Sequence, residues 1–201
     1  MSVINPSSFD HAEFEGFSND LLQELKIRAR LRLNALQSGD DAVLTFARII
    51  SKRRRWPWPQ EWKLQHALNI VASELDFRDW HQARAVLGGT AKRGDDMGGF
   101  WYARSGGVLL LNHWFSSYAE AQEYQRGGDR NRESRWLFPY GKQFVVGDRH
   151  YLQTLSMDPE LPLWEQVGRD LYGCYGSAAW HLLCAVRLQA TRGLPPPISR
   201  R

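Results

Sequence analysis

A run of cations lies directly beside two tryptophans in the N-terminal half of the chain. Residues 52–55 read Lys-Arg-Arg-Arg, and Trp56 and Trp58 follow, each before a proline. Lys and Arg neutralise phosphates while indole rings stack on bases or sugars, so the segment is suited to binding a nucleic acid or another polyanion. A solvated helix end with buried tryptophans would explain the same residues, because a helix C-terminus favours cations through its dipole. Both interpretations stay open.

Under the first interpretation, the residues that bind a polyanion or a partner extend beyond the run itself. The candidates are Arg28, Arg32, Lys52, Arg53, Arg54, Arg55, Trp56 and Trp58. A second surface is expected in the other half of the chain, where a polar loop contains Arg130, Arg132 and Arg135. No catalytic residue, metal ligand or cofactor is expected at either surface.

Another DNA-binding interpretation concerns two predicted helices joined by residues 74–79. Such a pair could imitate a helix-turn-helix, whose second helix enters a groove. That helix would offer Arg78, His81, Gln82 and Arg84 to solvent. Asp76 and Asp79 would face phosphate unfavourably, however, and simple helix packing explains the pair as well.

Metal chemistry has one candidate residue. His113 stands on an expected strand before a helix, an arrangement used by some metal-dependent nucleases. One histidine is not a site, and no histidines are spaced four apart to hold zinc on one helix face. We expect His113 to pack among Trp114, Phe115 and Trp136.

Signatures of nucleophilic catalysis and phosphate-binding loops are also weak. Cys174 and His181 could pair as thiolate and imidazolium, but the glycines at 173 and 176 place the cysteine in a turn rather than on the histidine's helix. Neither GxxxxGK[ST] nor GxSxG occurs. We therefore expect a protein that is not an enzyme. A metal-dependent nuclease or hydrolase that uses His113 is the third interpretation, after two binding functions.

Composition places the chain among globular proteins. Hydrophobic residues make up 43% and charged residues 24% of its 201 residues, which suits one ordinary domain or two small ones. The apolar runs are far too short to cross a bilayer, and no secretory signal is read at the start. Its two cysteines are expected to be free thiols. We expect a cytoplasmic protein without membrane insertion.

The elements that position these residues begin with four helices before residue 90. The first starts after a cap at Ser18 or Asn19, and Asp40 caps the second, which ends at the basic run and the prolines behind it. The third follows Pro59. Asp79 caps the fourth, and a glycine pair stops it.

Beyond residue 99 the pattern favours strands and further helices. Strands are expected at 100–104, 107–115, 136–140 and 143–146, and helices at 118–126, 150–157, 163–172 and 177–191. We therefore predict an α+β protein, with a four-helix N-terminal unit followed by a small antiparallel sheet with helices.

A glycine-rich stretch sets the expected domain organisation. The predicted parts are an acidic arm (1–17), a helical domain (18–89), a Gly-rich linker (90–98), an α+β domain (99–192) and a flexible tail (193–201). Residues 1–20 hold four acidic and no basic residues, whereas 21–55 hold nine basic and three acidic ones. The arm could shield the basic surface, or its rings at Phe9, Phe14 and Phe17 could complete the helical core.

Residues 63–87 resemble a small helical module labelled glyoxalase-related in bacterial proteins. The residues at its pattern positions are Ala67, Leu68, Val71, Ala72, Leu75, Phe77 and Trp80, while Asp76 replaces the usual glycine. That module is an accessory helical segment, so the resemblance implies no glyoxalase chemistry.

The second half is similar to small proteobacterial accessory proteins of plasmids and other mobile elements. The matching stretches are LLLNHWFSSYAEAQEY, WLFPYGKQFVV and LSMDPELPLWEQVGRD. Such proteins include fertility-inhibition factors, so the resemblance implies a non-enzymatic interaction protein that inhibits conjugative transfer by acting on the coupling protein or the DNA-processing complex. The alternative is a DNA-associated regulator that binds through residues 52–58.

Overall fold

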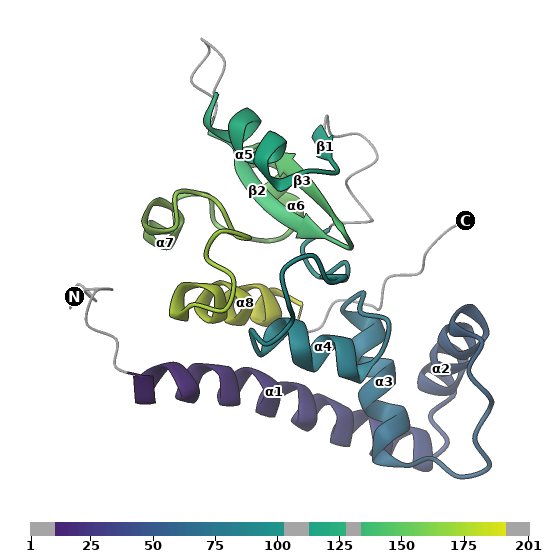
Figure 1. Cartoon of the computed structure of the whole chain (residues 1–201). Helices are drawn as coiled ribbons and strands as arrows, with labels where there is room; N and C mark the ends of the chain where they lie inside the picture. The colour runs from purple at the N-terminus through teal and green to yellow at the C-terminus, as the bar shows by residue number, and fades with distance from the viewer. Residues whose placement is uncertain (1–10, 103–112, 128–133, 192–201) are drawn as a thin grey trace.

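The structure, a computed structural model, describes residues 11–102, 113–127 and 134–191, with side chains from residue 20 onward. Its elements are α1 (His11–Gln37), α2 (Asp41–Arg54), α3 (Leu64–Glu74), α4 (Trp80–Leu87), β1 (His113–Phe115), α5 (Tyr118–Arg126), β2 (Trp136–Tyr140), β3 (Gln143–Gly147), α6 (Arg149–Thr154), α7 (Pro162–Gln166) and α8 (Ala178–Ala190). The predicted α+β class is confirmed. Figure 1 shows α1 along one side, with α3, α4 and α8 packed on it and the sheet beyond them.

Aspartate caps begin two of the N-terminal helices. The Asp40 carboxylate accepts a hydrogen bond from the N–H of Val43 at 3.0 Å, and Asp79 accepts one from the N–H of Gln82 at 2.9 Å. Both predicted caps are confirmed, because a side-chain oxygen satisfies an amide that has no partner within the helix.

The first helix begins earlier than predicted. It starts at His11, so the predicted start after Ser18 or Asn19 is wrong. Residues 11–17 contain no proline, and acidic residues near a helix N-terminus interact favourably with its dipole. The rings of Phe9, Phe14 and Phe17 lie outside the described part of the chain, so the role of the acidic arm stays a prediction.

The turn between α3 and α4 needs a residue in the left-handed region. Asp76 has a φ of +64° there, a conformation that favours glycine. The residues at and just after the end of the predicted linker pack on this turn: the N–H of Gly99 donates to the carbonyl of Asp76 at 3.0 Å. A Cβ added to Gly98 would lie 2.5 Å from the ring of Phe77, so only glycine allows this approach.

In the described residues, three strands form an antiparallel sheet in the order β1-β3-β2. The predicted strands at 136–140 and 143–146 are confirmed, joined by a turn in which Gly141 has a φ of +56°. The structure describes only residues 113–115 of the strand predicted at 107–115, and these residues form β1. The strand predicted at 100–104 is wrong for its described residues, because Phe100 and Trp101 lie in a turn closed by a bond from the Tyr102 N–H to the Gly99 carbonyl.

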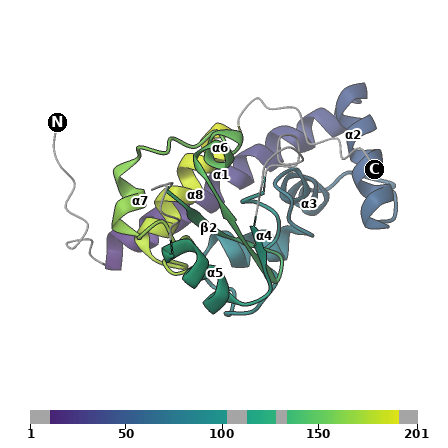
Figure 2. The same ribbon diagram turned by 90° about the horizontal axis from the view of Figure 1, so that it is seen from above.

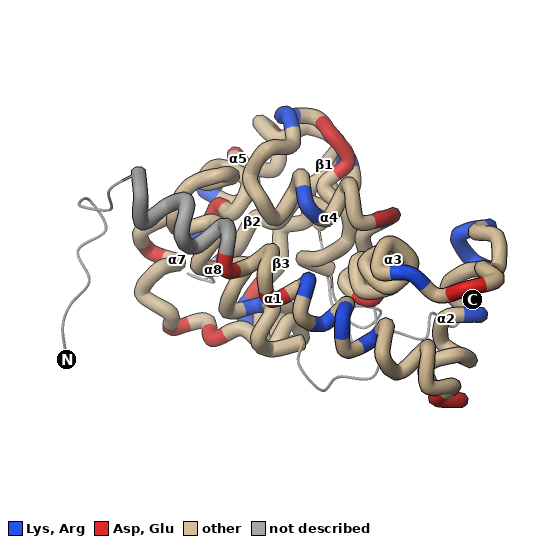
Figure 3. Tube along the Cα trace, turned by 90° about the horizontal axis from the view of Figure 1, so that it is seen from below, with Lys and Arg blue, Asp and Glu red and all other residues tan. Residues whose placement is uncertain are grey.

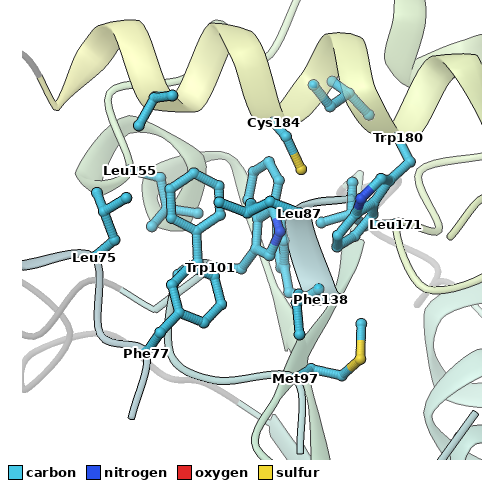
Figure 4. Packing of buried hydrophobic residues seen from close by; sticks show 14 of the residues in the cluster. Leu75, Phe77, Leu87, Met97, Trp101, Phe138, Leu155, Leu171, Trp180 and Cys184 are labelled. Atoms are coloured by element: carbon cyan, nitrogen blue, oxygen red, sulfur yellow. The ribbon is translucent and has the colours of Figure 1, made fainter. Parts of the chain in front are cut away.

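One hydrophobic cluster joins the N-terminal helices to the sheet, α6 and α8. Trp101 is 1% exposed, and its ring centroid lies 5.2 Å from Phe100, 6.2 Å from Phe138 and 6.0 Å from Trp180. Figure 4 shows this packing beneath α8. The two predicted units therefore share a core, while their division into domains stays a prediction.

The predicted helix at 163–172 is wrong beyond Gln166, where α7 ends. Gly168 and Arg169 have φ values of +60° and +57°, which no α-helix contains. The backbone then runs along β2, because the N–H of Leu137 donates to the carbonyl of Arg169 and the Leu137 carbonyl accepts from Leu171. Tertiary pairing thus ends this helix early.

A second, smaller core holds α2 at one end of the molecule. Its buried residues are Leu36, Phe46, Ala47, Ile50 and Ile70. Figures 1 and 2 both place α2 away from the sheet and α5. Among the described residues, no helix combines the length and apolar character required to cross a bilayer.

Candidate functional site

The predicted basic-aromatic segment forms the corner between α2 and α3. We call the α2–α3 corner the surface made by Arg48, Lys52, Arg53, Arg55, Trp58 and Trp62. Arg55 ends α2 with a φ of +57°, and its N–H donates to the Lys52 carbonyl at 3.3 Å. This local turn leaves the side chains of Lys52, Arg53 and Arg55 exposed within one helical turn.

None of the ion pairs between described residues includes Lys52, Arg53 or Arg55. Figure 3 shows Lys and Arg positions around α2 and along α1, with a few acidic positions near α2 as well. The corner can therefore attract an anion without first displacing an acidic side chain of the described fold.

The two tryptophans of the segment differ in their surroundings. Trp56 is half-buried against the small core, whereas Trp58 is 45% exposed. The Arg48 guanidinium lies 5.3 Å from the Trp58 ring centroid, and the Trp62 ring meets Trp58 edge-on at 5.0 Å. Of the two, only Trp58 is exposed, while Trp56 packs partly against the small core.

A hollow of about 340 Å³ opens beside this ring pair. It is lined by Pro59, Gln60, Glu61, Lys63, Gln65 and His66. The Nδ1 atom of His66 accepts a hydrogen bond from the Lys63 N–H at 3.0 Å, which fixes the imidazole at the start of α3. The lining combines amides, one ammonium group and one carboxylate, and so suits a polar, largely neutral group.

Arg28, Arg32 and Arg54 are occupied within the fold. Arg54 donates to the Phe77 carbonyl at 2.7 Å, and Arg32 pairs with Glu74 at 2.7 Å. Burial raises the pKa of Glu74, an effect that Arg32 opposes. These contacts fix α2 to the α3–α4 turn and α1 to α3; binding by these residues stays a prediction.

Arg28 connects the first helix to the last one. Its guanidinium donates to the Leu188 carbonyl at 2.8 Å and to the Thr191 Oγ1 atom at 3.0 Å, and it also pairs with Glu24 at 3.0 Å. The side chain thus caps the Leu188 carbonyl group near the C-terminal end of α8.

The second predicted arginine surface is only partly described. Arg130 and Arg132 lie outside the described residues. The Arg135 guanidinium lies over the Tyr124 ring at 4.3 Å and donates to the Tyr124 carbonyl at 2.9 Å. Arg135 thus holds α5 against the start of β2.

One of the four residues that the helix-turn-helix interpretation places in solvent is buried in the structure. Gln82 was expected in solvent but is 6% exposed, because its amide accepts from the Arg78 N–H at 2.6 Å and donates to the Asp96 carbonyl at 2.8 Å. Arg78 pairs with Asp79 at 3.1 Å. His81 and Arg84 are exposed.

The histidine and cysteine candidates differ in their surroundings. His113 is exposed with its ring 4.4 Å from Tyr124, so the expectation that it packs among tryptophans is wrong. Burial raises the pKa of the Cys174 thiol to about 12 and lowers the pKa of His181, so both groups are held neutral near pH 7. No described group of His, Cys, Asp and Glu side chains could hold a metal ion.

Sequence reasoning missed a buried carboxylate. Asp170, which falls in the helix predicted at 163–172, is 8% exposed and accepts hydrogen bonds from the Tyr118 hydroxyl at 2.7 Å, the Gln122 amide at 3.0 Å and the Gly173 N–H at 2.8 Å. Burial and the Asp170 carboxylate raise the pKa of Tyr118 above its ordinary value. The cluster joins α5 to the segment after α7.

A group of aromatic rings that includes Trp114 on β1 and Tyr140 on β2, the two outer strands of the sheet, was also missed. The ring centroids of Tyr102, Trp114 and Tyr140 lie 4.9 to 5.5 Å apart, and Trp114 is 42% exposed. Alternation along the strands gives no signal for this group, because Tyr102 reaches it from outside the sheet.

No family model, curated protein or solved structure matches the chain in the three comparisons made. Both resemblances stated above therefore stay predictions.

Proposed function

We propose that this chain is a non-enzymatic binding protein whose α2–α3 corner contacts the phosphates of a nucleic acid. The observation that carries the proposal is the group of exposed cations, Lys52, Arg53 and Arg55, beside the exposed ring of Trp58. None of these three side chains takes part in an ion pair between described residues. Phosphate contact by such groups releases condensed counterions, so binding weakens as salt rises.

Replacing Lys52, Arg53 and Arg55 together with alanine is expected to flatten the salt dependence of binding. Each lost contact removes about 0.9 from the slope of log affinity against log salt on duplex DNA, so the variant should lose up to about 3. Anisotropy of a labelled oligonucleotide at several salt concentrations measures this slope.

A matched control removes the same charge elsewhere. Alanine at Lys92, Arg93 and Arg126 lowers the net charge equally at exposed positions outside the α2–α3 corner. It should shift the slope much less. Equal flattening by both variants, or no binding by the wild-type chain at low salt, contradicts the proposal.

We further propose that the protein belongs to a plasmid or other mobile element and inhibits conjugative transfer through a protein partner, the coupling protein or the DNA-processing complex. The resemblance of the second half supports this role. The group of Tyr102, Trp114 and Tyr140 also supports it, because Trp114 is 42% exposed and aromatic rings are frequent in binding hot spots.

Donor cells that express the wild-type chain should give fewer transconjugants than donors without it. Trp114→Ala should restore transfer, because it removes the most exposed ring of the group. Ile27→Ala, which truncates an exposed side chain on α1, serves as the control. Unchanged transfer of several plasmid types by the wild-type chain contradicts the role.

A further inference from the structure

We infer that the α2–α3 corner prefers single-stranded nucleic acid to duplex, with one unstacked base on the ring of Trp58. The inference rests on the proposed function and adds the kind of nucleic acid that binds. In a duplex, every base is stacked and paired, so its faces are closed to a protein ring. A single strand offers those faces freely, and base–aromatic stacking is the usual source of its affinity.

The position of Trp58 suits this role. Its ring is 45% exposed although two neighbours contact it, the Arg48 guanidinium at 5.3 Å from its centroid and the nearly perpendicular Trp62 ring at 5.0 Å. Pro57 and Pro59 flank it and restrict the backbone. Because the ring is already ordered, stacking a base on it costs little additional entropy.

Trp62 is fixed in turn by the end of α1. The Gln37 amide donates to the Trp62 carbonyl at 3.1 Å, and the Trp62 ring meets His66 edge-on at 5.9 Å. The aromatic part of the corner is therefore connected to α1 and α3, two helices of the fold, and forms a supported platform.

The α2–α3 corner and the hollow beside it differ in charge. Lys52, Arg53 and Arg55 supply the cations on the α2 side, where phosphates are attracted. The hollow beside them contains Glu61 and Lys63, which form an ion pair at 3.8 Å so that their charges largely cancel, together with the amides of Gln60 and Gln65. A backbone along the cations would therefore direct a base or sugar, rather than a phosphate, toward the hollow.

Trp58→Ala tests the inference on the full chain. Labelled oligothymidylate and oligouridylate of about 20 nucleotides, and a duplex of about the same length, cover the range of site sizes known for single-strand binders. The variant should bind either single strand about 5- to 100-fold more weakly and the duplex within about twofold of wild type. Trp58→Phe, which retains a stacking ring, should recover most of the affinity.

Ile27→Ala is the matched control, since Ile27 is 46% exposed on α1, and thermal melting checks that each variant is folded. An equal loss on duplex and single strand overturns the inference, as does unchanged binding of the single strands by Trp58→Ala. Both of those results leave the proposed function standing if binding still depends on the three cations. No binding to any of the oligonucleotides at low salt overturns both.

Discussion

Trp101→Ala is expected to lower the free energy of unfolding by about 3–5 kcal/mol, the usual cost of removing a buried indole ring. The ring is 1% exposed and contacts rings from three other parts of the fold: Phe100 before it, Phe138 on β2 and Trp180 on α8. Removing it leaves a cavity where the N-terminal helices, the sheet and α8 meet. Since domains are stable by only about 5–15 kcal/mol, a large share of the native state's stability is lost.

Urea denaturation followed by circular dichroism measures the loss. Trp58→Ala is the control, because it removes the same side chain at a position that is 45% exposed, and it should change stability by about 0.5 kcal/mol or less. Equal unfolding free energies for the two variants would show that Trp101 is not the centre of the core.

Asp170→Ala is expected to cost about 2–4 kcal/mol, because hydrogen bonds to a charged group are stronger than neutral ones and three donors lose their acceptor. Those donors are the Tyr118 hydroxyl, the Gln122 amide and the Gly173 N–H. Tyr118→Phe removes one of the three bonds and should cost roughly 1 kcal/mol. Chemical denaturation measures both losses.

Glu123→Ala is the control for this pair, since Glu123 is an exposed carboxylate on α5. The two cluster mutations should be non-additive, because they remove the same hydrogen bond. If Asp170→Ala is no more destabilising than Glu123→Ala, the buried cluster does not stabilise the fold.

The same cluster predicts a pH dependence. The pKa of Tyr118 is raised in the native state from its ordinary value of 10, so the unfolded chain loses this phenolic proton first. Stability from the raised pKa is complete below about pH 10 and is lost as pH rises further. In Asp170→Ala this alkaline loss should be smaller, because one cause of the raised pKa is gone.

Elements with local causes could be predicted from the sequence. Asp40 and Asp79 cap helices through amides three residues away, so the signal lies within one turn of chain. The β2–β3 hairpin is likewise marked by Gly141, whose φ of +56° suits the turn. Such features need no knowledge of the rest of the fold.

Features with distant causes could not be predicted. Arg32 reads as a surface cation until Glu74 is brought within 2.7 Å of it. From the sequence, Gln82 is expected to face solvent, whereas in the fold its amide donates to the Asp96 carbonyl of the glycine-rich stretch. The candidate site shows the same division. The exposure of Lys52, Arg53 and Trp58 follows from local chemistry, whereas the contacts of the other arginines inside the fold depend on tertiary structure.

The contact of Arg28 with the end of α8 joins residues 160 positions apart in the chain. At a synthesis rate of about 5–20 residues per second, Arg28 is made roughly 8–30 s before its partner at the end of α8. During that interval α3 and α4 can cover part of the apolar face of α1, but the side that packs on α8 stays open. Until α8 is complete, the nascent chain therefore exposes this apolar side of α1 to solvent.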